Sequence, residues 1–357
     1  MKFLILMSSG KKKEIGRLHL KSIYLRTGIN ADLMKSNYMR GIVFFVCLFV
    51  PVMMCAAQER VELIPFGNFE TWLVREIKES FLLGGMEKTL HEPAPAEHIK
   101  GNKSYRRHAF SPWRTSNVMA DVGVVKTSAS VFPDTVEGGK CARLDTKIEK
   151  CKVLGFVNIE VLASGSLFLG EMDEPIKNTK EPMKKILPGI SFERRPAALM
   201  LDYKFKAVDK EERVYMNGFS TVKKVPGRDS AEILLLLQKR WEDENGNVFA
   251  KRIGTLVRRL VYPDAEWKTA VRFPVVYGDI TALPGYKSYM GLMNRERIYY
   301  CKNTKGNIVP IRETEWGEAN DVPTHMIIFI SSSCGGAYVG TVGNSLWVDN
   351  ISLVYTE

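Results

Sequence analysis

The C-terminal stretch Gly340-Thr-Val-Gly-Asn-Ser-Leu-Trp-Val-Asp-Asn-Ile-Ser-Leu-Val-Tyr355 decides the fold, because a glycine-rich turn leads directly into a long alternating segment. In that segment Leu346, Val348, Asn350 and Ser352 alternate with Trp347, Asp349, Ile351 and Leu353. A period of two places successive side chains on opposite faces of a β-strand. We therefore predict a closing strand over Leu346–Tyr355. The apolar run His325–Ser331 predicts the strand that precedes the glycine-rich loop.

The rest of the chain repeats this pattern. Further strand-length apolar or alternating stretches are Leu199–Lys206, Ala231–Leu237 and Trp267–Val276. Turn sequences such as Asn217-Gly218 and Pro226-Gly227 separate them. Many strands joined by turns, without a long amphipathic helix, predict an all-β protein built as an antiparallel sandwich.

Three stretches of the chain do not follow the alternating pattern. Residues 70–83 have room for a helical turn or two. Residues 84–107 are rich in Pro, His, Lys and Glu and predict an irregular excursion. Residues 173–188 mix Pro with Lys and predict an exposed loop.

The first 57 residues have the pattern of an export signal behind a misplaced start, with Met34 or Met39 as the true start. A cationic region up to Arg40 precedes the apolar run Gly41–Met54, which is too short to span a bilayer comfortably. Small residues follow, so cleavage before Gln58 is expected and the mature protein is exported as one domain over residues 58–357. Lipidation of Cys55 is the alternative, and the bulky Met54 before it argues against that.

The net charge of +11 resides mostly in this leader. Residues 1–57 hold nine basic and two acidic residues, a net +7, which leaves +4 for the other 300 residues. So weak a field predicts no nucleic-acid partner. An oxidising compartment permits disulfides. The four cysteines after residue 57 allow three pairings or free thiols, and the sequence does not choose among them: Cys141, Cys151, Cys301 and Cys334.

An ordered series of short motifs resembles the putative carbohydrate metabolism domain family of glycan-foraging bacteria. Beside the closing Ser345-Leu-Trp-Val-Asp349, the series comprises Asn68-Phe-Glu-Thr-Trp72, Ser111-Pro-Trp-Arg-Thr-Ser-Asn117, Gly138-Gly-Lys-Cys-Ala-Arg-Leu144, Ala163-Ser-Gly-Ser-Leu-Phe-Leu-Gly170, Arg195-Pro196, Leu201-Asp-Tyr-Lys-Phe205 and Gly227-Arg-Asp-Ser-Ala231. The resemblance implies a jelly-roll sandwich akin to galactose-binding and carbohydrate-binding modules, in an exported protein of polysaccharide use. Cys141 departs from the pattern, where Ser or Ala is commoner.

A sugar-binding role requires flat aromatic faces beside amides, carboxylates or arginines. Aromatic residues in loop-like contexts meet this requirement best. The predicted carbohydrate-binding residues are Trp113 with Arg114 and Asn117, Tyr286 with Tyr289, and Trp316. The predicted partner is an oligo- or polysaccharide, together with other cell-surface glycan-utilisation proteins.

No cofactor is required for such a role, and a structural calcium ion is the one metal considered. Related sugar-binding jelly rolls hold calcium where the first and last strands meet. The resemblance places Glu70 and Asp349 at that position, although both carboxylates would equally serve as acceptors for backbone amides at strand ends.

No catalytic residues are predicted. The segment Glu171-Met-Asp-Glu-Pro175 is superficially similar to the acidic strand of jelly-roll glucanases. Pro175 stands where the second glutamate is needed, and proline would cost a ladder hydrogen bond. We therefore expect glycan capture without chemistry. The alternatives are a glycoside hydrolase or lyase with an unidentified carboxylate pair, and a structural or adhesive surface protein.

Overall fold

The computed structural model describes residues 58–153, 157–178, 181–218, 221–293 and 297–356, so the predicted leader lies outside the described residues. Residues 58–357 form one compact unit. Its described part contains no α-helix, only the short 3₁₀ turns η2 (Phe81–Leu83), η3 (Pro182–Lys185) and η4 (Ser288–Met290). None of the helices in these ranges has the length and apolarity to cross a membrane.

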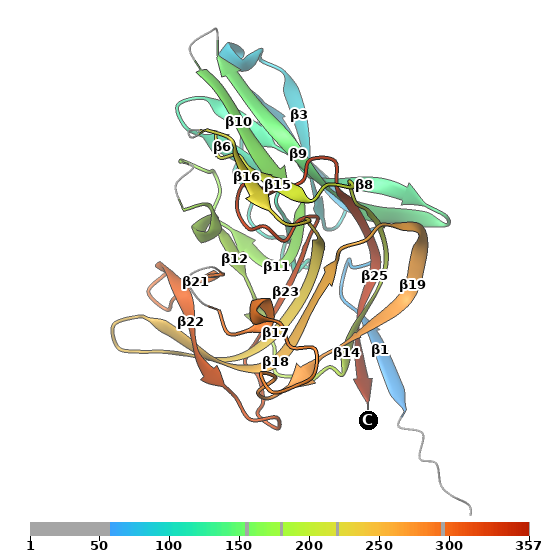
Figure 1. The fold of residues 1–357 in the computed structure, drawn as a ribbon. Helices are drawn as coiled ribbons and strands as arrows, with labels where there is room; N and C mark the ends of the chain where they lie inside the picture. The colour runs from blue at the N-terminus through green and yellow to red at the C-terminus, as the bar shows by residue number, and fades with distance from the viewer. Residues whose placement is uncertain (1–57, 154–156, 179–180, 219–220, 294–296, 357) are drawn as a thin grey trace, which may run out of the picture. The chain divides into compact units, whose positions relative to one another are not determined.

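Two large sheets form the molecule (Figure 1). In the first, the strand order is β10 (Val157–Ser164), β9 (Gly139–Val153), β25 (Ser345–Thr356), β14 (Ala198–Lys206) and β19 (Asp264–Pro274), with β1 (Glu59–Leu63) beside β25 and β8 (Val131–Val136) beside β9. Every pair in this sheet is antiparallel.

The second sheet has the order β12 (Ile186–Pro188), β11 (Ser166–Met172), β23 (His325–Ser331), β17 (Ala231–Glu242), β18 (Val248–Leu260), β22 (Ile308–Trp316) and β21 (Tyr300–Lys302), with β5 (Trp113–Thr115), β13 (Ile190–Ser191) and β20 (Val276–Tyr277) attached. Its β18–β22 pair is parallel and its other pairs are antiparallel. The predicted all-β, jelly-roll sandwich class is confirmed.

Smaller sheets complete the described chain. They are β3 (Glu87–Pro93), β2 (Trp72–Lys78) and β4 (Glu97–Lys100); β16 (Lys223–Pro226), β15 (Glu212–Tyr215) and β24 (Val339–Gly340); and β6 (Val118–Asp121) with β7 (Val125–Ser128). The stretches expected to be irregular are therefore more ordered than predicted. Residues 70–83 form β2 and one 3₁₀ turn, residues 84–107 contain β3 and β4, and residues 173–188 contain η3 and β12.

Strand β17 is buried on both faces, which explains its unbroken apolar run. Ile233, Leu235 and Leu237 belong to the core between the two sheets. Leu234 and Leu236 pack on the other face, in a second cluster. A strand covered on both sides gains from an apolar residue at every position, so the usual alternation disappears. The predicted strands at 199–206, 231–237, 267–276, 325–331 and 346–355 correspond to β14, β17, β19, β23 and β25.

The closing strand β25 departs from simple alternation. Leu346 and Val348 face the core, but the next core residues are Ile351 and Leu353. The change of phase falls at Asn350, whose φ of 52° lies in the left-handed region, opposite a register shift in β14. This is a β-bulge, which inserts one extra residue and so reverses which face later side chains occupy.

Candidate functional site

Trp113, Arg114 and Asn117 lie together at β5 but inside the protein, each 0% exposed. The Trp113 indole Nε1 donates to the Pro65 carbonyl at 2.9 Å. The Asn117 amide donates to two carbonyls and accepts from two backbone amides, all within 3.0 Å, so it has no capacity left for a sugar hydroxyl. In this structure these side chains build the interior, and a saccharide has no access to them.

Arg114 belongs to a buried network of two arginines and two glutamates. Its Nη1 lies 2.6 Å from Glu92 Oε1, and its guanidinium covers the Tyr105 ring at 4.4 Å. Arg75 donates twice to Glu174, at 2.9 and 3.0 Å. Equal numbers of opposite charges make this burial tolerable. Glu174, in the segment similar to a glucanase strand, is therefore a structural residue.

The other aromatic candidates lie in two further places. Tyr289, in η4, is covered by the Arg259 guanidinium 3.8 Å from its ring centroid, and Tyr286 precedes it in the adjoining turn. Trp316 ends β22 with the Arg252 guanidinium 5.7 Å from its ring. All three are half-buried, and the structure does not bring them to the Trp113 group.

Glu70 and Asp349, the predicted calcium ligands, influence each other electrostatically. Burial raises the pKa of Asp349 to about 6, and the carboxylates of Asp202 and Glu70 add to the rise. Glu70 accepts a backbone hydrogen bond from Lys140 at 3.2 Å, and Asp349 accepts one from Asn350 at 2.8 Å. Within the described ranges no group of three or more His, Cys, Asp or Glu residues is arranged to hold a metal ion.

Three of the four cysteines can be placed. Cys141, Cys301 and Cys334 carry free thiols, so they do not pair among themselves in this structure. The side chain of Cys151 lies outside the described residues.

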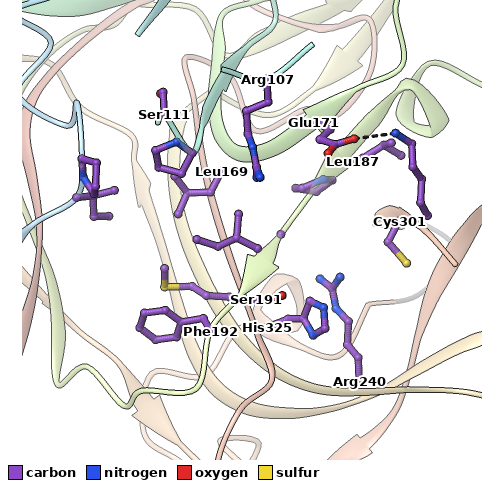
Figure 2. A pocket seen from close by; sticks show the side chains of 18 of the residues that line it. Arg107, Ser111, Leu169, Glu171, Leu187, Ser191, Phe192, Arg240, Cys301 and His325 are labelled. Carbon is purple, nitrogen blue, oxygen red and sulfur yellow. Dashed lines mark hydrogen bonds and ion pairs between the residues drawn. The ribbon is translucent and has the colours of Figure 1, made fainter. Parts of the chain in front are cut away.

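A cavity of about 930 Å³ is lined by residues from both large sheets, and none of the predicted site residues lines it (Figure 2). The segment 107–112, the junction of β12 and β13, and the ends of β17, β21 and β23 supply most of its lining. We refer to it as the cleft. Small-molecule sites occupy about 300–1,000 Å³, and the cleft lies near the upper end of that range. It therefore has room for several sugar rings.

Two exposed aromatic rings border the cleft. Phe110 is 75% exposed, and Trp241 is 43% exposed while its ring stacks on Phe249 at 5.8 Å. Sequence reasoning missed both as site residues. For Trp241 the available signal was the end of β17, where the buried run ends at Gln238 and Lys239-Arg-Trp-Glu242 follows. Where a strand extends beyond the core that covers it, its polar and aromatic side chains are exposed to solvent.

Two acids of the cleft, Glu62 and Glu171, are held in their ionised form. Hydrogen bonds from Arg194 and Arg60 lower the pKa of Glu62 to about 2. A hydrogen bond from Lys302 lowers the pKa of Glu171. Glu242 accepts from the amide and hydroxyl of Thr304 at 2.9 and 2.7 Å.

The cleft also contains His325 and Arg240. Burial, together with the positive charge of Arg240, lowers the pKa of His325 to about 4, so this imidazole is neutral near pH 7. Its Nδ1 lies 2.9 Å from the Thr324 hydroxyl. An open cleft with aromatic borders, arginines and a neutral histidine has the chemistry of a polar ligand site on a β-sandwich.

A known protein-family model matches part of this chain. Residues 88–259 match the model of the putative carbohydrate metabolism domain, so this stretch of the chain is similar to that domain. The resemblance predicted from the sequence is thereby confirmed. No curated protein matches the chain.

Several solved structures are similar to this chain at low identity. A putative glycoside hydrolase from Bacteroides thetaiotaomicron is 20% identical over 77% of this chain and 76% of its own, with a TM-score of 0.43. One from Bacteroides vulgatus is 17% identical over 63% and 76%, with a TM-score of 0.36. The carbohydrate-binding module TmCBM61, in complex with β-1,4-galactotriose, is 12% identical over 70% and 90%, with a TM-score of 0.23.

Proposed function

We propose that this protein captures a glycan in the cleft and performs no chemistry on it. The observation that carries the proposal is the cleft itself, about 930 Å³ and bordered by the exposed rings of Phe110 and Trp241. Aromatic faces stack on the C–H surfaces of pyranose rings, while arginine, histidine and backbone groups bond the hydroxyls. The similarity of residues 88–259 to the carbohydrate-metabolism domain supports a saccharide as the ligand.

The state of the cleft acids favours binding over hydrolysis. A glycosidase needs one carboxyl group that remains protonated near neutral pH, opposite a second that is ionised. Glu62 and Glu171 both have pKa values below the ordinary range, because each is hydrogen-bonded to a cation. Neither is suited to donate a proton to a leaving group.

The setting we propose is the cell exterior. The pattern of residues 1–57 supports export by a cleaved signal, and other surface proteins of glycan use are the proposed partners. A calcium ion at Glu70 and Asp349 would be structural, since neither residue lines the cleft.

A saccharide panel tests the proposal. Binding to neutral and acidic oligosaccharides is measured by calorimetry, and each mixture is then analysed for new reducing ends. For any bound saccharide, Trp241→Ala and Phe110→Ala are each expected to weaken affinity roughly three- to tenfold. Tyr262→Ala is the matched control, because Tyr262 is 74% exposed and does not line the cleft. Absence of binding across the panel, or steady turnover of a bound saccharide, would overturn the proposal.

A further inference from the structure

The cleft carries more positive charge than its own acids neutralise. Its basic side chains are Arg107, Arg194, Arg240 and Lys302. Two of them are paired: Arg194 donates twice to Glu62, at 2.6 and 2.8 Å, and Lys302 donates to Glu171 at 2.7 Å. Arg107 and Arg240 remain for a ligand.

Arg240 is half-buried and forms no ion pair with an acid among the described residues. Its Nε donates to the Gln238 amide oxygen at 2.8 Å. Its Nη2 is buried and has no hydrogen-bond partner among the described residues. A buried guanidinium N–H left unpaired costs free energy, which an incoming acceptor would recover. Desolvation lowers the pKa of Arg240 to about 10, so the group is still a cation at neutral pH.

The backbone beside Arg240 leaves room for its guanidinium. A Cβ placed on Gly189 would lie 2.6 Å from Arg240 Nη2, and Gly189 has a φ of +123° that disfavours other residues. Figure 2 shows the Arg240 guanidinium turned from the end of β17 toward the space between Leu187 and His325. The glycine therefore leaves the space that the Arg240 guanidinium occupies in the wall of the cleft.

Arg107 reaches the same cavity from the opposite side. It is exposed and forms no ion pair or hydrogen bond within the described part of the chain. Its positive charge contributes to the lowered pKa of Glu171, a carboxylate that already accepts from Lys302. In Figure 2 the Arg107 side chain extends down into the cavity while that of Arg240 extends up. Glu242, the remaining acid of the lining, is bonded to Thr304 rather than to either arginine.

We propose that the cleft is specific for acidic saccharides, with the carboxylate of a hexuronate residue bound by Arg240 and Arg107. This inference rests on the proposed glycan-binding function and names its ligand class. Guanidinium groups present planar pairs of N–H donors that match a carboxylate. The neutral imidazole of His325 is placed to bond a ring hydroxyl of the same sugar.

The test compares charged and uncharged forms of one saccharide. Protein purified from cells that express the full chain is titrated with trigalacturonate, its methyl-ester form, an oligoglucuronate, a sulfated galactan oligosaccharide and neutral galactotriose. We expect a uronate to bind at least tenfold tighter than the ester and neutral probes, with affinity falling as NaCl rises. Arg107→Gln is expected to weaken uronate binding about tenfold, and Arg240→Gln more. Arg106→Gln is the matched control, since Arg106 is exposed and lies outside the cleft lining.

The outcomes separate this inference from the proposed function. The acidic specificity is overturned if neutral galactotriose or the ester binds as tightly as the uronates and Arg107→Gln has no effect. That result leaves glycan capture intact. Tighter binding of the sulfated probe than of every uronate overturns the carboxylate assignment. Failure of every saccharide to bind overturns both. Because Arg107 is exposed, its variant remains informative even where Arg240→Gln fails to fold.

Discussion

Replacing Glu174 by glutamine should destabilise the protein severely, although the residue takes no part in ligand binding. Glu174 accepts two hydrogen bonds from Arg75, at 2.9 and 3.0 Å. It also accepts from the backbone amides of Tyr105 at 2.8 Å and Met119 at 2.6 Å. One carboxylate thus ties β2, the chain around Tyr105 and β6 to the end of β11.

The size of the destabilisation follows from the balance of buried charges around Glu174. Arg75, Arg114, Glu92 and Glu174 have side chains 0% exposed and sum to zero charge. Glutamine is nearly isosteric, but it leaves one buried positive charge uncompensated and turns an acceptor into a donor. Removing one partner from a buried ion pair costs about 3–5 kcal/mol. That is a large share of the 5–15 kcal/mol by which domains are ordinarily stable.

Urea unfolding followed by tryptophan fluorescence measures this effect. Asp173→Asn is the matched control, because Asp173 precedes Glu174 in the chain but its own carboxylate is 45% exposed. Its ion pair to Lys185 spans 3.5 Å. Such a surface pair contributes at most about 1 kcal/mol. A loss below 1 kcal/mol for Glu174→Gln, or an equal loss for both variants, would refute the reasoning that Glu174 is a structural charge.

Three further predictions concern the core, the cleft and the metal. Leu235→Ala should cost about 2–5 kcal/mol in urea unfolding, since Leu235 is 0% exposed between the sheets. The pKa of His325 is lowered from 6.5 to about 4, so the unfolded chain binds its proton more readily. Stability should therefore fall as pH drops from 6.5 toward 4, and His325→Gln should flatten that part of the pH profile. If Glu70 and Asp349 hold calcium, about 1 mM Ca²⁺ should raise the melting temperature of chelator-treated protein. The Asp349→Asn variant should then lose that increase.

The fold was predictable because its signal is distributed along the chain. Runs such as 325–331 and 346–355 carry apolar side chains at strand spacing, and the strands formed there. Local irregularities of the backbone, such as β-bulges, have no comparable signal in the sequence. The bulge at Asn350 depends on the pairing of β25 with β14, which a single strand does not reveal. Likewise Glu87–Pro93 forms a strand against β2 despite its polar composition.

The site was less predictable, because a loop-like sequence context does not report burial. Trp113 follows Ser111-Pro112, a sequence typical of an exposed turn, yet β5 pairs with β11 and its side chains are covered. The cleft depends on where distant segments end relative to one another. Phe110 and Trp241 become neighbours of one cavity only after the sheets have formed.

The residues that build the interior and the residues that line the cleft come from different parts of the chain, and this separation affects how such a domain acquires ligand specificity. The motif around Trp113 and Arg114, which carries part of the family resemblance, forms interior contacts and a buried ion network. The cleft instead takes Arg107 from the loop before β5 and Arg240 from the end of β17. A substitution at the exposed Arg107 can change charge and shape without disturbing the core, because only the surface around it has to adjust. A shared sandwich is therefore compatible with different glycans, and the arginines of the cleft are the residues through which this chain would select an acidic one.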